Sequence, residues 1–213
     1  GRPSCVYTFH PAPRDVLRPD NTVVRIQRQH EKLRCLGALG VDQVVIEPFT
    51  LAFSQHDAQW FAQEILLRRL GASCVYVGWD FRFGRDRQGG RSQLDRWMKG
   101  DVIEVGPFQL QDQVVSSSRI RQEVHAGDIE CAATLLGRPH RVVGQVVKGD
   151  GRGRTLGFAT ANLLTETPLV PAAGVYAVRV TWGHDAPRDA VVNIGTRPTF
   201  AEAAPSFEVH VLD

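Results

Sequence analysis

GQVVKGDGRGRTLGFATAN, residues 144–162, marks the point where helical patterns give way to short β-rich runs. After Lys148 the stretch places four glycines and two arginines close together. Glycine lets backbone N–H groups approach an anion without an obstructing Cβ, and the cations offset the anion's charge. Thr160 and Asn162 then offer hard oxygen atoms of the type that magnesium accepts. The stretch favours a polyphosphate-binding loop, although a flexible hairpin with a basic tip also fits, because the spacing is not that of a Walker motif.

Beyond Gly137 the chain consists of short β-rich runs separated by glycine and proline, with no strong helical pattern. Regular turns between such strands predict a small antiparallel barrel or sandwich, and a barrel would also remove exposed sheet edges. We place the boundary at Gly137-Arg138-Pro139, which gives domains at 1–137 and 138–213. The predicted strands are VVGQVV, GVYAVRVTW, AVVNIG and FEVHVL.

The first half alternates extended apolar runs with helical patterns, which predicts an α/β domain with a parallel sheet wrapped by helices. The segment 57–70 is typical: Asp57 can cap a helix, Gly71 follows its end, and an apolar stripe on one side belongs to the core. The stripe consists of Trp60, Phe61, Ile65 and Leu66. We expect strands at 4–9, 44–49, 74–78 and 102–106, and helices at 25–39, 57–70, 117–126 and 128–136.

Composition excludes several classes of protein. The count of 25 Lys+Arg against 23 Asp+Glu leaves a formal charge of +2, so we expect no dense basic surface and no nucleic-acid partner. No apolar run approaches the roughly 20 residues that cross a bilayer, and no basic-then-apolar leader opens the sequence. We therefore expect a cytoplasmic protein without a membrane partner, and we leave self-association open. The four cysteines form no C-x-x-C pair and are expected to be reduced and mostly buried.

VSSSRIR, residues 115–121, follows an extended run and opens a helical pattern. A helix start presents free N–H groups and the positive end of the helix dipole. Ser116, Ser117 and Ser118 add hydroxyl donors and Arg119 adds charge, a combination that suits the phosphates of a nucleotide. A serine-capped helix with solvated arginines explains the segment equally well.

A third cluster, VGWDFRFGRDRQGG at 77–90, follows a predicted strand. Loops at the carboxyl ends of parallel strands commonly hold ligands. Asp80 offers an acceptor or a metal ligand, and Phe81 and Phe83 offer flat surfaces on which a ring can stack. For the two phenylalanines we favour the simpler interpretation, which is packing in the core beneath a solvated loop.

Taken together, these segments resemble the bacterial bifunctional riboflavin kinase/FMN adenylyltransferases, also called FAD synthetases. The resemblance implies a nucleotidylyltransferase-type (Rossmann-like) α/β domain, followed by a small antiparallel six-stranded β-barrel that is the riboflavin kinase domain. It also implies ATP, riboflavin, FMN and FAD as substrates or products, with Mg²⁺ as the metal. The segments that carry it, in the family's order, are VGWDFRFG, VSSSRIR, GDIECAATLLGRP, GRTLGFATANL, GVYAVRV, NIGTRPTF and FEVHVLD.

For the barrel, the resemblance implies phosphorylation of the riboflavin 5′-hydroxyl by ATP. Glu208 matches the family's general base, and Thr160 and Asn162 match its ligands for magnesium and phosphate. This agrees with the needs of phosphoryl transfer, which are cations on the moving charge and an acceptor beside the incoming hydroxyl. Without the resemblance, Glu208 is more simply explained as an exposed residue of an alternating strand. Further residues assigned by resemblance are Gly149, Gly151 and Arg154 for the nucleotide, and Asn193 and Arg197 for the flavin.

For the first half, the resemblance implies transfer of AMP from ATP to FMN without a covalent intermediate. Ser116, Ser117, Ser118 and Arg119 match the family's signature for the ATP phosphates, and Asp80 and Phe81 are assigned to the flavin. Positioning and charge neutralisation would supply the rate.

The chain departs from the family pattern at four places, one of which is Ala12, where a histidine is common. The family's His-x-Gly-His segment is missing from these residues, so we expect either further residues upstream or an impaired adenylyltransferase half. Ala159 stands where the family has proline, which loosens the backbone before the proposed metal ligands. The family's kinase domain also continues past the position of Asp213, which leaves open whether these residues close the barrel.

Two other classes of function remain as alternatives. One is a protein that binds flavin or adenine nucleotide without turnover, which the missing histidine segment favours. The other is a single-strand-binding barrel, which would need exposed aromatic side chains along a basic groove, and the second half has few aromatic residues.

Overall fold

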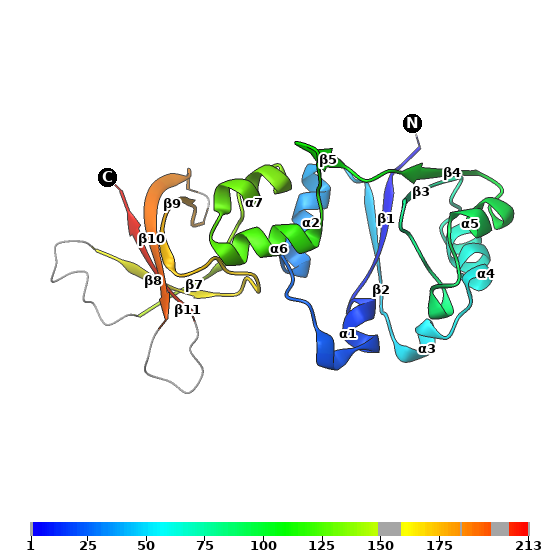
Figure 1. Cartoon of the computed structure of the whole chain (residues 1–213), viewed down its shortest axis with the longest axis horizontal. Helices are drawn as coiled ribbons and strands as arrows, with labels where there is room; N and C mark the ends of the chain where they lie inside the picture. Colours follow the sequence, from blue (N-terminus) through cyan, green and yellow to red (C-terminus); the bar gives the residue numbers. More distant parts are fainter. Residues whose placement is uncertain (1, 149–158, 184, 197–204, 213) are drawn as a thin grey trace. The chain divides into compact units, whose positions relative to one another are not determined.

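The computed structural model describes residues 2–148, 159–183, 185–196 and 205–212. Contacts between residues group the chain into two compact units (Figure 1). Unit 1 comprises Gly1–Val23 and Leu33–Val115, and unit 2 comprises Val24–Lys32 and Ser116–Asp213. Unit 2 therefore contains the helices around 117–136 as well as the β-rich half. The boundary at 137/138, placed where the sequence becomes β-rich, stays a prediction.

Unit 1 is built on parallel strands, as predicted. β1 (Cys5–Phe9) pairs in parallel with β2 (Gln43–Glu47), and β3 (Cys74–Gly78) pairs in parallel with β4 (Asp101–Val105). Within the described residues these are two separate pairs and not one continuous sheet. The remaining strands of this unit, β5 (Gln109–Leu110) and β6 (Gln113–Val114), form a short antiparallel hairpin.

Helices connect these strands and cover them. The crossover between β2 and β3 confirms the predicted helix at 57–70, because Asp57 Oδ1 accepts a hydrogen bond from Trp60 N at 2.7 Å and Gly71 follows the helix end with φ of 61°. Its apolar stripe is core, since Ile65 is 1% exposed. The widened π-type turns of its second part were not predicted. The elements are α1 (Pro13–Leu17), η1 (Pro19–Asn21), α2 (Gln29–Ala38), α3 (Leu51–Ser54), α4 (Ala58–Trp60) and η2 (Phe61–Arg69).

Two further elements, η3 (Arg85–Arg87) and α5 (Arg91–Trp97), lie where the sequence predicts only a polar loop. Gly90 is the N-cap of α5 and its N–H donates to Gln93 Oε1 at 3.0 Å, while Leu94 is completely buried. A helix this short has too few apolar residues to show helical periodicity, so the prediction missed it. The core of unit 1 consists of Ala58, Phe61, Ala62, Ile65, Leu66, Val77, Phe83, Leu94 and Met98.

Unit 2 begins with two helices that the sequence predicts closely, α6 (Ser117–Ala126) and α7 (Ile129–Leu136). The two helices contact each other. Both end at a glycine in the left-handed conformation, Gly127 and Gly137, which is the usual way to close a helix. Asp128 caps α7 by accepting from Cys131 N at 2.9 Å.

The β-rich half forms one antiparallel sheet in the order β7-β8-β11-β10-β9. Within the described residues the sheet is open, with β7 and β9 as its edges. One face packs on a core of Val192, Ile194 and Phe207. β8 was not predicted, because its sequence ANLLT does not alternate between apolar and polar residues. The strands are β7 (Gly144–Val147), β8 (Ala161–Thr165), β9 (Gly174–Val180), β10 (Arg188–Thr196) and β11 (Pro205–Val211).

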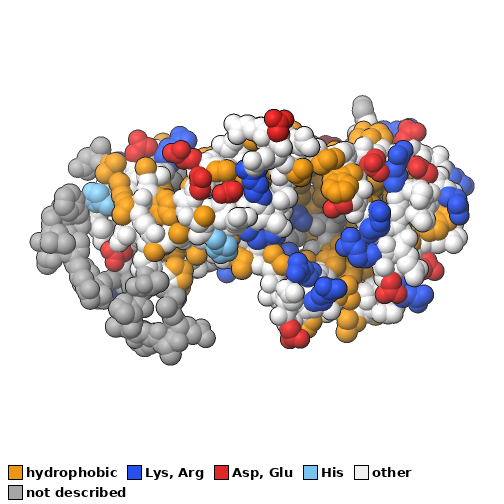
Figure 2. Space-filling model, viewed as in Figure 1, with side chains coloured by type: hydrophobic (Ala, Val, Ile, Leu, Met, Phe, Trp, Pro, Cys, Tyr) orange, Lys and Arg blue, Asp and Glu red, His pale blue; other side chains and the backbone are white. Residues whose placement is uncertain are grey.

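The surface agrees with the near-neutral composition. On the face drawn in Figure 2, Lys and Arg side chains are interspersed with Asp and Glu side chains and with apolar ones. None of the helices in the described part of the chain is long and apolar enough to cross a bilayer. All four cysteines are free, but the expectation that most are buried is wrong: Cys5 is exposed and the other three are half-buried.

Candidate functional site

Three polar side chains form a row across the sheet of unit 2. Glu208 on β11 is directly opposite Asn162 on β8 and directly opposite Asn193 on β10. Residues that face each other across antiparallel strands project to the same side, with Cβ atoms about 4.5–5.5 Å apart. The sequence assigns these three residues to one site, and the sheet brings them together.

The row lies on the face opposite the core. Phe207, next to Glu208, is 3% exposed, while Glu208 and Asn193 are exposed and Asn162 is half-buried. Side chains alternate between faces along a strand, so burial of Phe207 forces Glu208 outward. The alternating-strand interpretation of Glu208 is therefore correct, and it is compatible with a role for the carboxylate between two amides.

Thr160 and Ala159 immediately precede β8. The pairing of β8 with β11 ends at Ala161, which is opposite Val209. One step further, His210 Nδ1 lies 2.9 Å from the carbonyl oxygen of Ala159. His210 was not predicted as a site residue. It lies two residues after Glu208 on the same strand, a spacing that places both side chains on one face of the sheet.

The oxygen atoms at this end of the sheet suit Mg²⁺. The side chains of Thr160 and Asn162 offer a hydroxyl and an amide oxygen, and Glu208 opposite Asn162 offers a carboxylate. Hard oxygen donors of this kind are what magnesium takes from proteins, usually while keeping several waters. The donor set therefore fits the metal. The predicted loop residues Gly149, Gly151 and Arg154 lie outside the described residues, as does Arg197.

The second predicted phosphate site is the start of α6. Ser116 is the helix cap and accepts from Arg119 N at 3.3 Å, while Ser117 and Ser118 are exposed in the first turn. The capping interpretation of Ser116 is therefore confirmed. Ser117 and Ser118 keep their hydroxyl groups at a helix end where the N–H groups and the dipole favour an anion.

Arg119 already has anionic and polar neighbours. Its Nε lies 3.5 Å from Glu123 Oε1, and its Nη2 lies 4.0 Å from Cys131 Sγ. The side chain is 26% exposed. Arg121, two residues on, donates from Nε to the carbonyl of Val24 at 2.6 Å. The two arginines are thus held by the protein and are not merely solvated.

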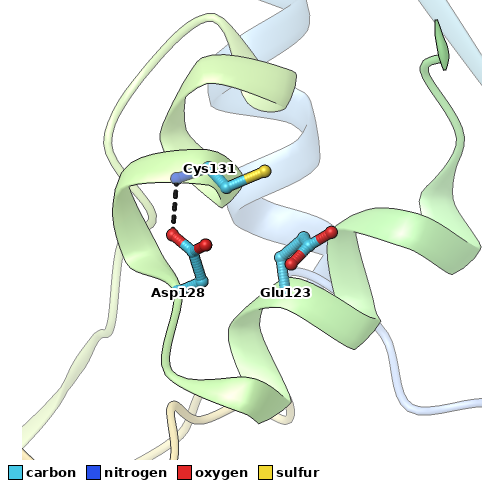
Figure 3. Close-up of side chains that lie close together, drawn as sticks. All are labelled: Glu123, Asp128 and Cys131. Atoms are coloured by element: carbon cyan, nitrogen blue, oxygen red, sulfur yellow. Dashed lines mark hydrogen bonds between the residues drawn. The ribbon is translucent and has the colours of Figure 1, made fainter.

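Glu123 and Cys131, together with Asp128, bring three potential metal-binding atoms within 4.8 Å of one another. Figure 3 shows Glu123 projecting from α6 toward the start of α7, where Asp128 makes the cap hydrogen bond to Cys131 N. The carboxylate of Glu123 is paired with Arg119 and that of Asp128 serves as a cap. Both carboxylates therefore have partners within the protein, and the cluster is explained by the packing of α6 against α7.

The third predicted cluster lies in unit 1. Asp80 is exposed, whereas Phe81 packs against the core and stacks on Phe83, with ring centroids 5.2 Å apart and planes inclined by 17°. Phe83 is itself buried, so the packing interpretation is confirmed for it. Asp80 and Phe81 belong to unit 1 and the serines of α6 belong to unit 2.

A charged cluster that the sequence does not reveal surrounds a small cavity of about 10 Å³ in unit 2. Arg28 pairs with Glu166 at 3.4 Å, and Arg141 pairs with Glu31 at 3.8 Å. His140 Nε2 lies 3.0 Å from the carbonyl of the buried Leu169. Burial lowers the pKa of His140, and the nearby positive charge of Arg138 acts in the same direction. Ion pairs between residues far apart in the sequence therefore form part of the wall of this cavity.

Comparison with known proteins identifies both halves of the chain. The family model described as FAD synthetase matches residues 1–119, and the one described as riboflavin kinase matches residues 136–213. Among curated proteins, the bifunctional riboflavin kinase/FMN adenylyltransferase of Escherichia coli K12 is 37% identical, with 99% of this chain covering 68% of that protein. The enzymes of the same name from Pseudomonas fluorescens and Bacillus subtilis are 37% and 34% identical, and the chain covers 69% and 67% of them.

A solved structure supports the same architecture. A crystal structure described as a macrolide-efflux protein from Streptococcus pneumoniae matches with a TM-score of 0.91 and 33% identity, covering 99% of this chain and 69% of that one. Two family models in tandem and relatives matched along nearly the whole chain lead to one conclusion. The chain belongs to the bifunctional riboflavin kinase/FMN adenylyltransferase family.

Proposed function

We propose that this chain phosphorylates riboflavin to FMN with ATP and adenylylates FMN to FAD. The observation that carries the kinase activity is the row Asn162–Glu208–Asn193 within the region that matches riboflavin kinase. A carboxylate flanked by two amides, on the solvent side of a rigid sheet, has the position and chemistry of a general base.

In the kinase reaction, Glu208 takes the proton of the riboflavin 5′-hydroxyl as that oxygen bonds to the γ-phosphorus of ATP. The bond from this phosphorus to the bridging oxygen breaks, and ADP leaves. Thr160 and Asn162 would hold Mg²⁺, which when bound neutralises charge on the phosphates. Asn193 orients the flavin, because its amide lies beside Glu208. Arg197, Gly149, Gly151 and Arg154 are proposed for the same site from the sequence.

In the adenylyltransferase reaction, a phosphate oxygen of FMN attacks the α-phosphorus of ATP and pyrophosphate leaves. Ser117 and Ser118 donate to the phosphates from the first turn of α6, where helix N–H groups add to their effect. Arg119 joins them by exchanging Glu123 for phosphate, since an ion pair at a spacing of four on a helix contributes only about 0.2–0.5 kcal/mol. Asp80 and Phe81 are proposed for the flavin.

The proposed architecture follows the same division. The parallel pairs of unit 1 belong to a nucleotidylyltransferase-type, Rossmann-like sheet, and the open antiparallel sheet of unit 2 belongs to a six-stranded barrel. The functional boundary lies at 137/138. A cytoplasmic location and the absence of a nucleic-acid partner stay predictions from the sequence, and self-association stays open.

The alternative is a protein that binds flavin and nucleotide without turnover. It is favoured by the ion pair between Arg119 and Glu123, because a guanidinium bound to a carboxylate is not available to bind the ATP phosphates in adenylyl transfer. Incubating the chain with riboflavin and Mg-ATP, and then with FMN and Mg-ATP, separates the two by chromatography of the flavins. We expect FMN in the first reaction and FAD in the second. Bound flavin without any FMN would support the binding protein.

A further inference from the structure

His210 contacts the backbone just before the proposed nucleotide ligands. Its Nδ1 lies 2.9 Å from the carbonyl oxygen of Ala159, a residue 51 positions earlier in the chain. A carbonyl oxygen only accepts hydrogen bonds, so the contact requires a proton on Nδ1, which the ring donates. The hydrogen bond ties β11 to the residue that precedes Thr160.

This contact begins where the strand pairing stops. The β8–β11 register runs through Leu163, Asn162 and Ala161, and no further pair follows toward Thr160. Ala159 lacks the ring that would fix φ, so the backbone here has freedom that a proline would remove. Beyond the last backbone pair, the hydrogen bond from the His210 side chain is the next contact that joins β11 to the chain before β8.

We propose that His210 is a positioning residue for the nucleotide end of the kinase site. It fixes the backbone at Ala159 and so positions the adjacent Thr160, while the strand ladder itself holds Asn162 opposite Glu208. His210 and Glu208 are two residues apart on β11 and therefore lie on the same face of the sheet. One strand thus carries both the base and the support for the metal and nucleotide ligands. The proposal rests on the proposed kinase function and deepens it.

The test compares His210→Leu with His210→Asn in the full chain. Leucine removes the donor, whereas the asparagine amide places an N–H near the position of Nδ1. Calorimetric titration with Mg-ADP measures nucleotide binding directly, and steady-state assays give kcat and the KM for each substrate. We expect His210→Leu to weaken Mg-ADP binding and raise the KM for Mg-ATP by about 10-fold, the usual effect of losing a group that orients a ligand. The KM for riboflavin should stay near its original value, and His210→Asn should restore nucleotide binding.

His125→Leu is the matched control, because His125 is an exposed histidine of the same unit and should bind Mg-ADP like the unaltered chain. If His210→Leu does not fold, His210→Gln replaces it, since the longer amide places its N–H near the Nε2 position and should not restore binding. Unchanged Mg-ADP affinity without the donor, equal changes in both KM values, or no rescue by asparagine would overturn the proposal. Absence of FMN from the unaltered chain would instead defeat the proposed function, and Mg-ADP binding would still decide the role of His210.

Discussion

Glu208 on β11 is directly opposite Asn162 on β8, so the proposed base and a proposed metal ligand face the same side of the sheet. The backbone ladder fixes this pairing, and the burial of Phe207 beneath the sheet fixes the face. The geometry therefore does not depend on the glycine-rich loop that precedes it in sequence.

Replacement of Asn162 by alanine removes one oxygen ligand without disturbing the core. We expect FMN formation to fall by at least about 10-fold, because hydrogen bonds and ligands to charged groups contribute about 1.5–3 kcal/mol. Steady-state assays of FMN formation measure this, with thermal unfolding to show that the fold is kept. Glu130→Gln, an exposed position on α7, is the control and should not change the rate. Full FMN formation by Asn162→Ala would remove this residue from the site.

Ser117→Ala combined with Arg119→Ala should damage FAD formation and spare FMN formation. The double variant loses a hydroxyl donor and a positive charge at the start of α6, where we place the ATP phosphates of the second reaction. Rates of FMN→FAD and riboflavin→FMN conversion are measured on the same preparation. Glu123→Gln tests whether Arg119 is held back by its partner: FAD formation should be kept or increased, and a loss equal to that of the double variant would contradict the assignment.

Gly84 should not tolerate alanine. Its φ is +73°, and an added Cβ would lie 2.5 Å from the backbone N of Ala58, which cannot move without shifting the helix. We expect Gly84→Ala to lower the free energy of unfolding by about 2 kcal/mol or more. Gly37→Ala is the control: it lies in α2 with open space around it, and alanine there should raise stability by up to about 1 kcal/mol. Urea unfolding gives both values, and equal stability of the two variants would contradict the packing of this loop.

The much reduced solvation of His140 makes stability sensitive to pH. Its pKa is lowered in the folded state, so the unfolded chain binds the proton more readily. The stabilisation is complete above the unfolded value of about 6.5 and is lost as the pH falls toward the folded pKa. We expect the free energy of unfolding, measured with urea, to fall as the pH is lowered from about 7.5 to about 5.5. These two values lie about one unit above and below the pKa of the unfolded chain. His140→Gln retains a donor for the Leu169 carbonyl and should flatten this dependence, whereas an unchanged slope would contradict its assignment to His140.

Periodicity predicted much of the fold, because it reports which side of an element is buried. It located β1, β3, α6 and α7 closely, and it identified the stripe through Ile65 as core. It missed β8, whose alternation is obscured by two adjacent leucines, and it missed α5, in which Leu94 is the one buried residue.

The site could be predicted only in part. Residue types and the resemblance pointed to Asn162, Glu208 and Asn193, but their alignment in one row depends on strand register, which no local pattern specifies. Arg119 shows the opposite case, since its pairing with Glu123 follows from the four-residue spacing on a helix and competes with the predicted role. His210 was missed because its contact joins residues far apart in the chain.

The most direct measurement of the central claim is FMN formation by Glu208→Gln, compared with the unaltered chain, at saturating riboflavin and Mg-ATP. Glutamine keeps the size and hydrogen-bonding capacity of the side chain but cannot take up the hydroxyl proton. We predict that riboflavin and Mg-ADP still bind while the rate of FMN formation falls by about 100-fold or more, as expected for loss of a general base. A Glu208→Gln protein that makes FMN at the original rate would contradict the placement of the reaction on this face of the sheet.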